Sequence, residues 1–149
     1  MFDEKINFLN IFFDYLNSNN FNFVIPRGHQ DLNNCSIKND IDILIRGYDD
    51  KLIYGFMNTH NFSRRIDKFD YLYGAKPHIH YVNDKLDLHF DLVDGLYYCS
   101  LNDNHTFLPV EEVVLESFLN NKIRHQNYFI PKVEDELLHL TCHCFYDKK

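Results

Sequence analysis

The strongest constraint on the fold is a seven-residue run in which apolar and polar side chains alternate without exception. The run is Leu86-Asp87-Leu88-His89-Phe90-Asp91-Leu92. Successive side chains of a β-strand point to opposite faces of a sheet, so one face of this segment is apolar and the other carries three ionisable groups. The pattern predicts a strand with one face packed on a core. An ordinary half-exposed strand has a similar pattern, but it does not require three ionisable groups in succession.

A second strand-like segment carries a pair of carboxylates. It reads Asn39-Asp40-Ile41-Asp42-Ile43-Leu44-Ile45. Asp40 and Asp42 fall on one face, about 6.6 Å apart along the strand at ~3.3 Å per residue. Such a pair can hold two divalent ions ~3.5–4 Å apart, which clamp the attacking and leaving oxygens of a phosphoryl or nucleotidyl displacement. Hard oxygen ligands favour Mg²⁺ or Mn²⁺. A solvated edge strand is the alternative reading of this pair.

Two neighbouring features favour the metal site over the solvated strand. Upstream, a short strand ends at Pro26 and is followed by Arg27-Gly28-His29. Glycine lets a backbone approach a phosphate closely, and an arginine can pair with that phosphate, although a plain turn also accounts for Gly28. Downstream, the alternating strand supplies a third carboxylate, for which Asp87 is the first choice and Asp91 the alternative.

The remaining periodicity predicts an α+β domain with a mixed β-sheet, flanking helices and a helical C-terminal portion. Helices are expected over residues 2–16, 49–60, 110–120 and 134–145. Strands are expected over 21–25, 41–45, 77–82 and 85–93, with 63–73 as a further candidate, 83–84 as a hairpin turn and 27–39 as loop. In the last helix, Leu137, Leu138, Thr141 and Phe145 are in register. We expect a single domain over 1–149, with its core at about 20–110 and the helical part at about 110–149.

Composition limits the classes of partner. The net charge is −7 and no basic run occurs, which argues against a nucleic-acid partner. The acidic N-terminus does not resemble a secretory signal, no apolar stretch is long enough for a membrane span, and four irregularly spaced cysteines suit free thiols, so a cytoplasmic location is expected. His139 and His143 could bind zinc from one helix face, but no second half-site with a Cys-x2-Cys pair is present. The 14 Phe and 10 Tyr predict an aromatic core.

In this order, the segments resemble the nucleotidyltransferase superfamily with the DNA polymerase β-like fold. The signature is a strand, a glycine-containing turn, a strand with Asp-x-Asp, and a third aspartate on a later strand. Within it, the chain is most similar to a poorly characterised bacterial group with DIDLLV-like and DLHW-like strands. The matching segments are Arg27-Gly28, Asp40 to Ile45, His78-Ile79-His80, Asp87-Leu88-His89-Phe90 and the helical segment after Ile130-Pro131. The turn departs from the commonest form, because His29 follows Gly28.

The resemblance implies transfer of an NMP group from an NTP to a hydroxyl acceptor, with release of pyrophosphate. It assigns catalysis and metal binding to Asp40, Asp42 and Asp87, with Mg²⁺ or Mn²⁺ as cofactor, and nucleotide binding to Arg27, Gly28 and His29. Neither the acceptor nor the oligomeric state can be read from the sequence. Two alternatives stay open: an inactive nucleotide- or metal-binding regulatory module of the same fold, and another metal-dependent phosphoryl-transfer enzyme such as a nuclease, which the lack of a basic groove disfavours.

Overall fold

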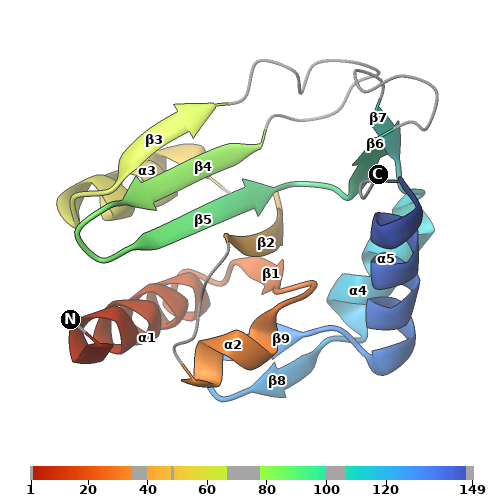
Figure 1. Cartoon of the computed structure of the whole chain (residues 1–149), viewed down its shortest axis with the longest axis horizontal. Helices are drawn as coiled ribbons and strands as arrows, with labels where there is room; N and C mark the ends of the chain where they lie inside the picture. The colour runs from red at the N-terminus through yellow and green to blue at the C-terminus, as the bar shows by residue number, and fades with distance from the viewer. Residues whose placement is uncertain (1, 35–39, 48, 67–77, 100–106, 147–149) are drawn as a thin grey trace.

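A five-stranded mixed sheet forms the centre of the computed structural model, which describes residues 2–34, 40–47, 49–66, 78–99 and 107–146 (Figure 1). Its strands are β1 (Asn22–Val24), β2 (Ile41–Arg46), β3 (Ser63–Ile66), β4 (Ile79–Asn83) and β5 (Leu88–Val93), in the order β1-β2-β5-β4-β3. β2 and β5 pair in parallel, and the other neighbours pair antiparallel. The predicted α+β class with a mixed sheet is therefore confirmed.

Five helices and two small hairpins complete the described part of the chain. The helices are α1 (Phe2–Ser18), α2 (His29–Asn34), α3 (Asp50–Thr59), α4 (Glu112–Asn120) and α5 (Val133–Tyr146). β6 (Tyr97–Cys99) pairs with β7 (Phe107–Pro109), and β8 (Ile123–His125) pairs with β9 (Tyr128–Ile130). α4 and α5 lie next to each other at one end of the sheet (Figure 1). None of the helices described here has the length and apolar character needed to cross a membrane.

One face of the sheet packs on an aromatic core formed with α1 and α3. Phe90 of β5 is fully buried, and its ring centroid lies 4.9 Å from that of Phe12, 6.0 Å from that of Phe8 and 5.7 Å from that of Phe62. Aromatic side chains bury large areas and pair edge-to-face at such distances. This packing agrees with the expected aromatic core, and it fixes which way β5 faces.

The opposite face of the sheet is covered at one end, where the strands meet α4. Val24, Leu44 and Val93 form a second apolar cluster there with Leu115 and Phe118. Further along the same face, β2, β4 and β5 present polar side chains instead. Because strand side chains alternate, the buried contacts to α1 and α4 determine the direction of each of these polar groups.

The hairpin between β4 and β5 differs from its prediction. The turn spans Asp84 to Asp87, so β5 begins at Leu88 and not at residue 85. The Asn83 side chain accepts a hydrogen bond from the Leu86 amide at 3.0 Å, and Asp87 has a φ of 50°. This local side-chain bond competes with strand pairing. It explains why the strand begins at Leu88 although the alternating pattern begins at Leu86.

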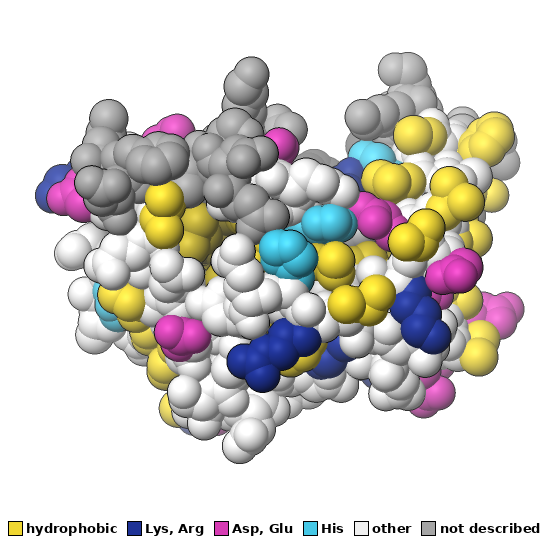
Figure 2. All heavy atoms as spheres, turned by 90° about the horizontal axis from the view of Figure 1, so that it is seen from below, with side chains coloured by type: hydrophobic (Ala, Val, Ile, Leu, Met, Phe, Trp, Pro, Cys, Tyr) yellow, Lys and Arg dark blue, Asp and Glu magenta, His cyan; other side chains and the backbone are white. Residues whose placement is uncertain are grey.

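Other elements also depart from expectation. The segment predicted as loop contains the short helix α2, and the pairs β6–β7 and β8–β9 include strands that were not predicted. β3 ends at Ile66, and residues 67–73 of that candidate strand lie outside the described residues. α5 forms as predicted, but Leu137, Leu138 and Phe145 are exposed while His139 is buried. Figure 2 shows apolar side chains on the side formed by α4 and α5.

Candidate functional site

Asp40 and Asp42 lie at the start of β2, a central strand of the sheet. Asp40 directly precedes the strand and its side chain is half exposed, whereas the Asp42 side chain is 19% exposed. Ile41 and Ile43 belong to the aromatic core, so Asp42 points to the opposite face, as predicted. The strand therefore places both carboxylates at the polar part of the sheet, beside β5.

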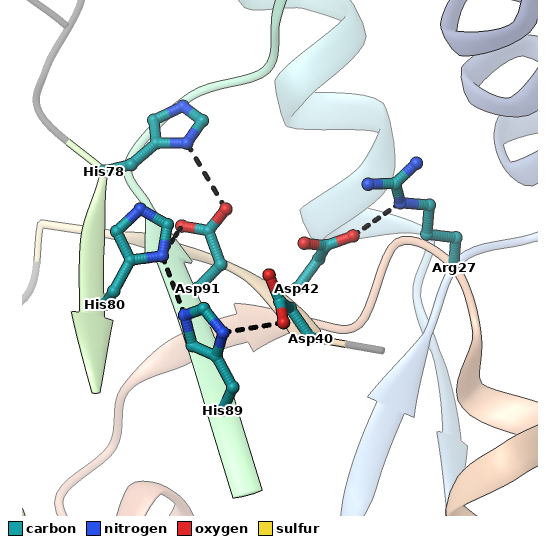
Figure 3. A network of polar contacts seen from close by, with 7 residues as sticks. All are labelled: Arg27, Asp40, Asp42, His78, His80, His89 and Asp91. Atoms are coloured by element: carbon teal, nitrogen blue, oxygen red, sulfur yellow. Dashed lines mark hydrogen bonds and ion pairs between the residues drawn. The ribbon is translucent and has the colours of Figure 1, made fainter. Parts of the chain in front are cut away.

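The neighbouring strand brings Asp91, and not Asp87, to this site. In the parallel pairing of β2 with β5, Asp42 is the register partner of Asp91. Paired residues on adjacent strands point to the same face, so these two carboxylates are side by side (Figure 3). The Asp91 side chain is 15% exposed, and its Oδ1 atom is buried without a hydrogen bond from any described residue.

Asp87, the first choice for the third carboxylate, is placed elsewhere. It belongs to the turn before β5, its side chain is 89% exposed, and its Oδ2 accepts a hydrogen bond from Lys5 of α1 at 3.2 Å. Asp87 and Asp91 alternate in the same phase in the sequence, but β5 begins only at Leu88, so Asp87 lies in the turn, beside Lys5 of α1. The described structure therefore groups Asp91, the alternative considered from sequence, with Asp42, and places Asp87 away from them.

Burial and charge around Asp42 favour a cation. Burial raises the pKa of the Asp42 carboxyl, the ion pair and hydrogen bond with Arg27 lower it, and the negative charges of Asp91 and Asp40 raise it further. The net direction is upward, which means that the present surroundings stabilise the ionised form poorly. An oxygen-ligated divalent cation fits this arrangement, because it neutralises clustered carboxylates and occupies unpaired oxygen atoms.

Arg27 supplies a permanent positive charge beside Asp42. Its Nε donates to Asp42 Oδ2 at 2.5 Å, and its Nη1 contacts His143 Nε2 of α5. The neighbouring Gly28 has a φ of +69°, a left-handed conformation that glycine adopts without strain, and no atom lies where a Cβ would be. The turn thus directs Arg27 to the carboxylates, although in this state the arginine engages Asp42 and not a phosphate.

His29 is tied to the C-terminal helix. Its Nε2 lies 3.1 Å from Glu136 Oε1 of α5. This contact and the one between Arg27 and His143 join segments more than 100 residues apart. No local pattern could have identified Glu136 and His143 as neighbours of the turn, because their positions depend on how α5 docks.

Three histidines extend the polar face along β4 and β5 (Figure 3). His89 Nδ1 lies 2.6 Å from Asp40 Oδ1, and its Nε2 lies 3.0 Å from His80 Nδ1. His78 Nδ1 lies 3.3 Å from Asp91 Oδ2. The pairing of β4 with β5 thus brings these three histidines to the face of the sheet that carries Asp91.

The two histidines of α5 have different partners among the described residues. His139 is buried and its Nδ1 lies 2.8 Å from the hydroxyl of Tyr98, while His143 contacts Arg27. Cys142 and Cys144 are free thiols on the same helix. Among the described residues, the potential metal ligands that gather within 4.8 Å of one another are His78, His80 and Asp91.

Comparisons with protein-family models, with curated proteins and with solved structures find no match to this chain. The function proposed below therefore rests on the geometry of the site and on the resemblance of the sequence motifs to those of nucleotidyltransferases.

Proposed function

We propose that this chain is a metal-dependent nucleotidyltransferase, in which Asp40, Asp42 and Asp91 form the carboxylate site. The observation that carries the proposal is the parallel pairing of β2 with β5, which sets Asp42 beside Asp91. The order of strand, glycine turn, Asp-x-Asp strand and later carboxylate strand is what the nucleotidyltransferase resemblance leads one to expect. Asp91 Oδ1 adds support, because it is buried and accepts no hydrogen bond from the described residues.

The three carboxylates have different roles in the proposed reaction. When bound, two Mg²⁺ or Mn²⁺ ions supply charge neutralisation for the triphosphate and activation of the acceptor hydroxyl. Asp40, Asp42 and Asp91 would together hold the ions, since Asp42 is the register partner of Asp91 and follows Asp40 by two residues. Asp91 would accept the proton that leaves the acceptor hydroxyl. The hydroxyl oxygen then bonds to the α-phosphorus as the bond to pyrophosphate breaks.

Arg27 and His89 hold this arrangement in place. Arg27 would leave its ion pair with Asp42 when a cation is bound there, and its guanidinium fork suits the phosphate oxygens of an NTP. His89, at 2.6 Å from Asp40, orients that carboxylate as a second-layer partner. Arg65 pairs in register with His80, so its exposed side chain lies on the same face and adds a second cation for the triphosphate.

The transfer reaction can be tested with labelled nucleotides. Purified protein is incubated with Mn²⁺, a cell extract as a source of acceptors, and NTPs labelled at either the α- or the γ-phosphate. Transfer of α-label but not γ-label, with matching release of pyrophosphate, is expected for the wild type and for Asp87→Asn. Asp42→Asn and Asp91→Asn should abolish it. Retention of transfer in both of these variants would place the chemistry elsewhere.

A regulatory binding module of the same fold is the second candidate. The contacts of Arg27 with Asp42 and His143, and of His29 with Glu136, favour it because they engage the turn in internal bonds. This candidate predicts Mn²⁺-dependent NTP affinity without transfer to any acceptor. Isothermal titration beside the transfer assay separates the two functions, and absence of both affinity and transfer rejects both.

A further inference from the structure

Beyond the carboxylate site, two histidines and one carboxylate converge at the edge of the same face. His78 directly precedes β4, His80 lies on β4, and Asp91 lies opposite His80 on β5, with one potential ligand atom from each within 4.8 Å of the others. Two imidazoles and one carboxylate are a ligand set suited to zinc, cobalt and iron(II) more than to magnesium. The strand register brings these three residue types together.

The separations between the potential ligand atoms are also those expected around a single ion. His78 Nδ1 lies 3.3 Å from Asp91 Oδ2, and His80 Nδ1 lies 3.8 Å from Asp91 Oδ1. The second distance is too long for a hydrogen bond. Ligand atoms on a tetrahedral ion with bonds of roughly 2.1 Å lie about 3.4 Å apart, which falls between the two values.

An independent observation comes from the Asp91 carboxylate. Its Oδ1 is buried and accepts no hydrogen bond from the residues that the structure describes. A buried carboxylate oxygen that accepts no hydrogen bond is costly, and a cation satisfies it. The side chains of His78, His80 and Asp91 are 26%, 14% and 15% exposed, so an ion can enter and keep a solvent ligand.

A third histidine contacts this cluster. His89 Nε2 lies 3.0 Å from His80 Nδ1, and His89 Nδ1 lies 2.6 Å from Asp40. A ring nitrogen bound to a metal has no lone pair or proton left for a hydrogen bond, so an ion bound through His80 Nδ1 would take the place of this contact with His89. The same chain of contacts connects this cluster to the carboxylate pair of β2.

We propose that His78, His80 and Asp91 bind one divalent transition-metal ion of the zinc class, with solvent completing its coordination. The site is distinct from the Asp40–Asp42 pair but shares Asp91 with it. The site does not depend on nucleotidyl transfer, because neither its ligand set nor the buried Asp91 Oδ1, which accepts no hydrogen bond from the described residues, involves a nucleotide.

Cobalt(II) is the probe for this site, because its visible absorption reports both coordination number and ligand type. Metal-free full-length protein is titrated with Co²⁺ in the absence of nucleotide. We expect one ion per chain with visible absorption of a four- or five-coordinate nitrogen and oxygen site. His78→Gln and His80→Gln should weaken binding at least about 100-fold, since losing even an outer partner costs 10–100-fold. His125→Gln, in the distant β8, is the matched control and should bind as the wild type does.

Two further variants keep the test decisive. His80→Cys should retain binding and add a thiolate-to-cobalt charge-transfer band, a gain of signal that a misfolded variant cannot give. Asp40→Asn combined with Asp42→Asn should lose the Mn²⁺ and NTP response while keeping the cobalt spectrum, so failure of this site and failure of the proposed function are distinguishable. Unchanged cobalt binding in His78→Gln and His80→Gln, or a thiolate band in the wild type, would overturn the proposal.

Discussion

Asp87 and Asp91 offer a comparison between two aspartates of one hairpin. Asp91 lies beside Asp42, whereas Asp87 is exposed and bonded to Lys5. Mn²⁺ that binds the native state should raise the melting temperature of the wild type through linkage. We expect Asp91→Asn to lose most of this increase and Asp87→Asn to keep it, as measured by calorimetry at several Mn²⁺ concentrations.

The opposite pattern has a clear meaning. If Asp87→Asn abolishes the Mn²⁺ response and Asp91→Asn preserves it, the third carboxylate is Asp87 after all, and the turn must rearrange when the metal binds.

We expect Arg27 to have two roles. It neutralises Asp42 in the metal-free protein, and it contacts a phosphate group in the nucleotide complex. Arg27→Gln should lower the unfolding free energy of the metal-free protein by about 1 kcal/mol, a figure discounted because the arginine side chain is 31% exposed. It should also weaken NTP affinity more than turnover, since a contact made in both ground and transition states changes binding. Urea unfolding and isothermal titration measure the two effects.

Arg64 provides the control for this variant. Its Nη2 donates to Asp50 at 2.8 Å on the α3 side of the sheet, away from the site. Arg64→Gln should leave NTP affinity unchanged. Equal losses of affinity in both variants would show that the effect of Arg27 is not local.

At the level of elements, we expect the apolar face of β5 to contribute to stability and its polar face to contribute to metal binding. Phe90 is fully buried among Phe8, Phe12 and Phe62, so Phe90→Ala should destabilise the fold by about 3–5 kcal/mol. His89→Ala, one position away on the polar face, should cost far less stability and instead weaken the metal response. Chemical unfolding of both variants checks this, and similar losses of stability would contradict the alternation.

The same alternation explains what could be predicted of the elements. Helix stripes and strand alternation depend on local spacing, so α1, α3, β2 and β5 were predicted close to their observed places. The start of β5 was predicted three residues too early because the Asn83 side chain accepts a hydrogen bond from the Leu86 amide, which a hydrophobicity pattern does not record. α2 and the small hairpins were missed because they are short and owe their form to neighbouring segments.

α5 shows a different limit of prediction. Its length was predicted, but its stripe of leucines is exposed and His139 is buried. The His139 ring lies near those of Tyr98 and Phe118, with ring centroids 5.9 Å and 6.0 Å away. Aromatic packing and one hydrogen bond to Tyr98 set the docking, and these partners are far away in sequence.

At the scale of the whole molecule, the candidate site depends on topology more than on motif. The Asp-x-Asp spacing identified Asp40 and Asp42, but the choice between Asp87 and Asp91 required the register of β5 on β2. Similarly, His78 and His80 are two residues apart in the sequence, but only the β4–β5 pairing shows that they reach Asp91. The strand register therefore determines which residues of these separate motifs lie together in one cluster.

The central claim is that Asp40, Asp42 and Asp91 together hold two ions on a bound nucleotide. Electron paramagnetic resonance of Mn²⁺ with a nonhydrolysable NTP analogue tests it without knowledge of the acceptor. The account predicts two Mn²⁺ ions per chain whose spins are coupled, as expected for ions ~3.5–4 Å apart, with the coupling lost in Asp91→Asn and kept in Asp87→Asn. A single uncoupled ion, or a coupled pair unaffected by Asp42→Asn and Asp91→Asn, would contradict it.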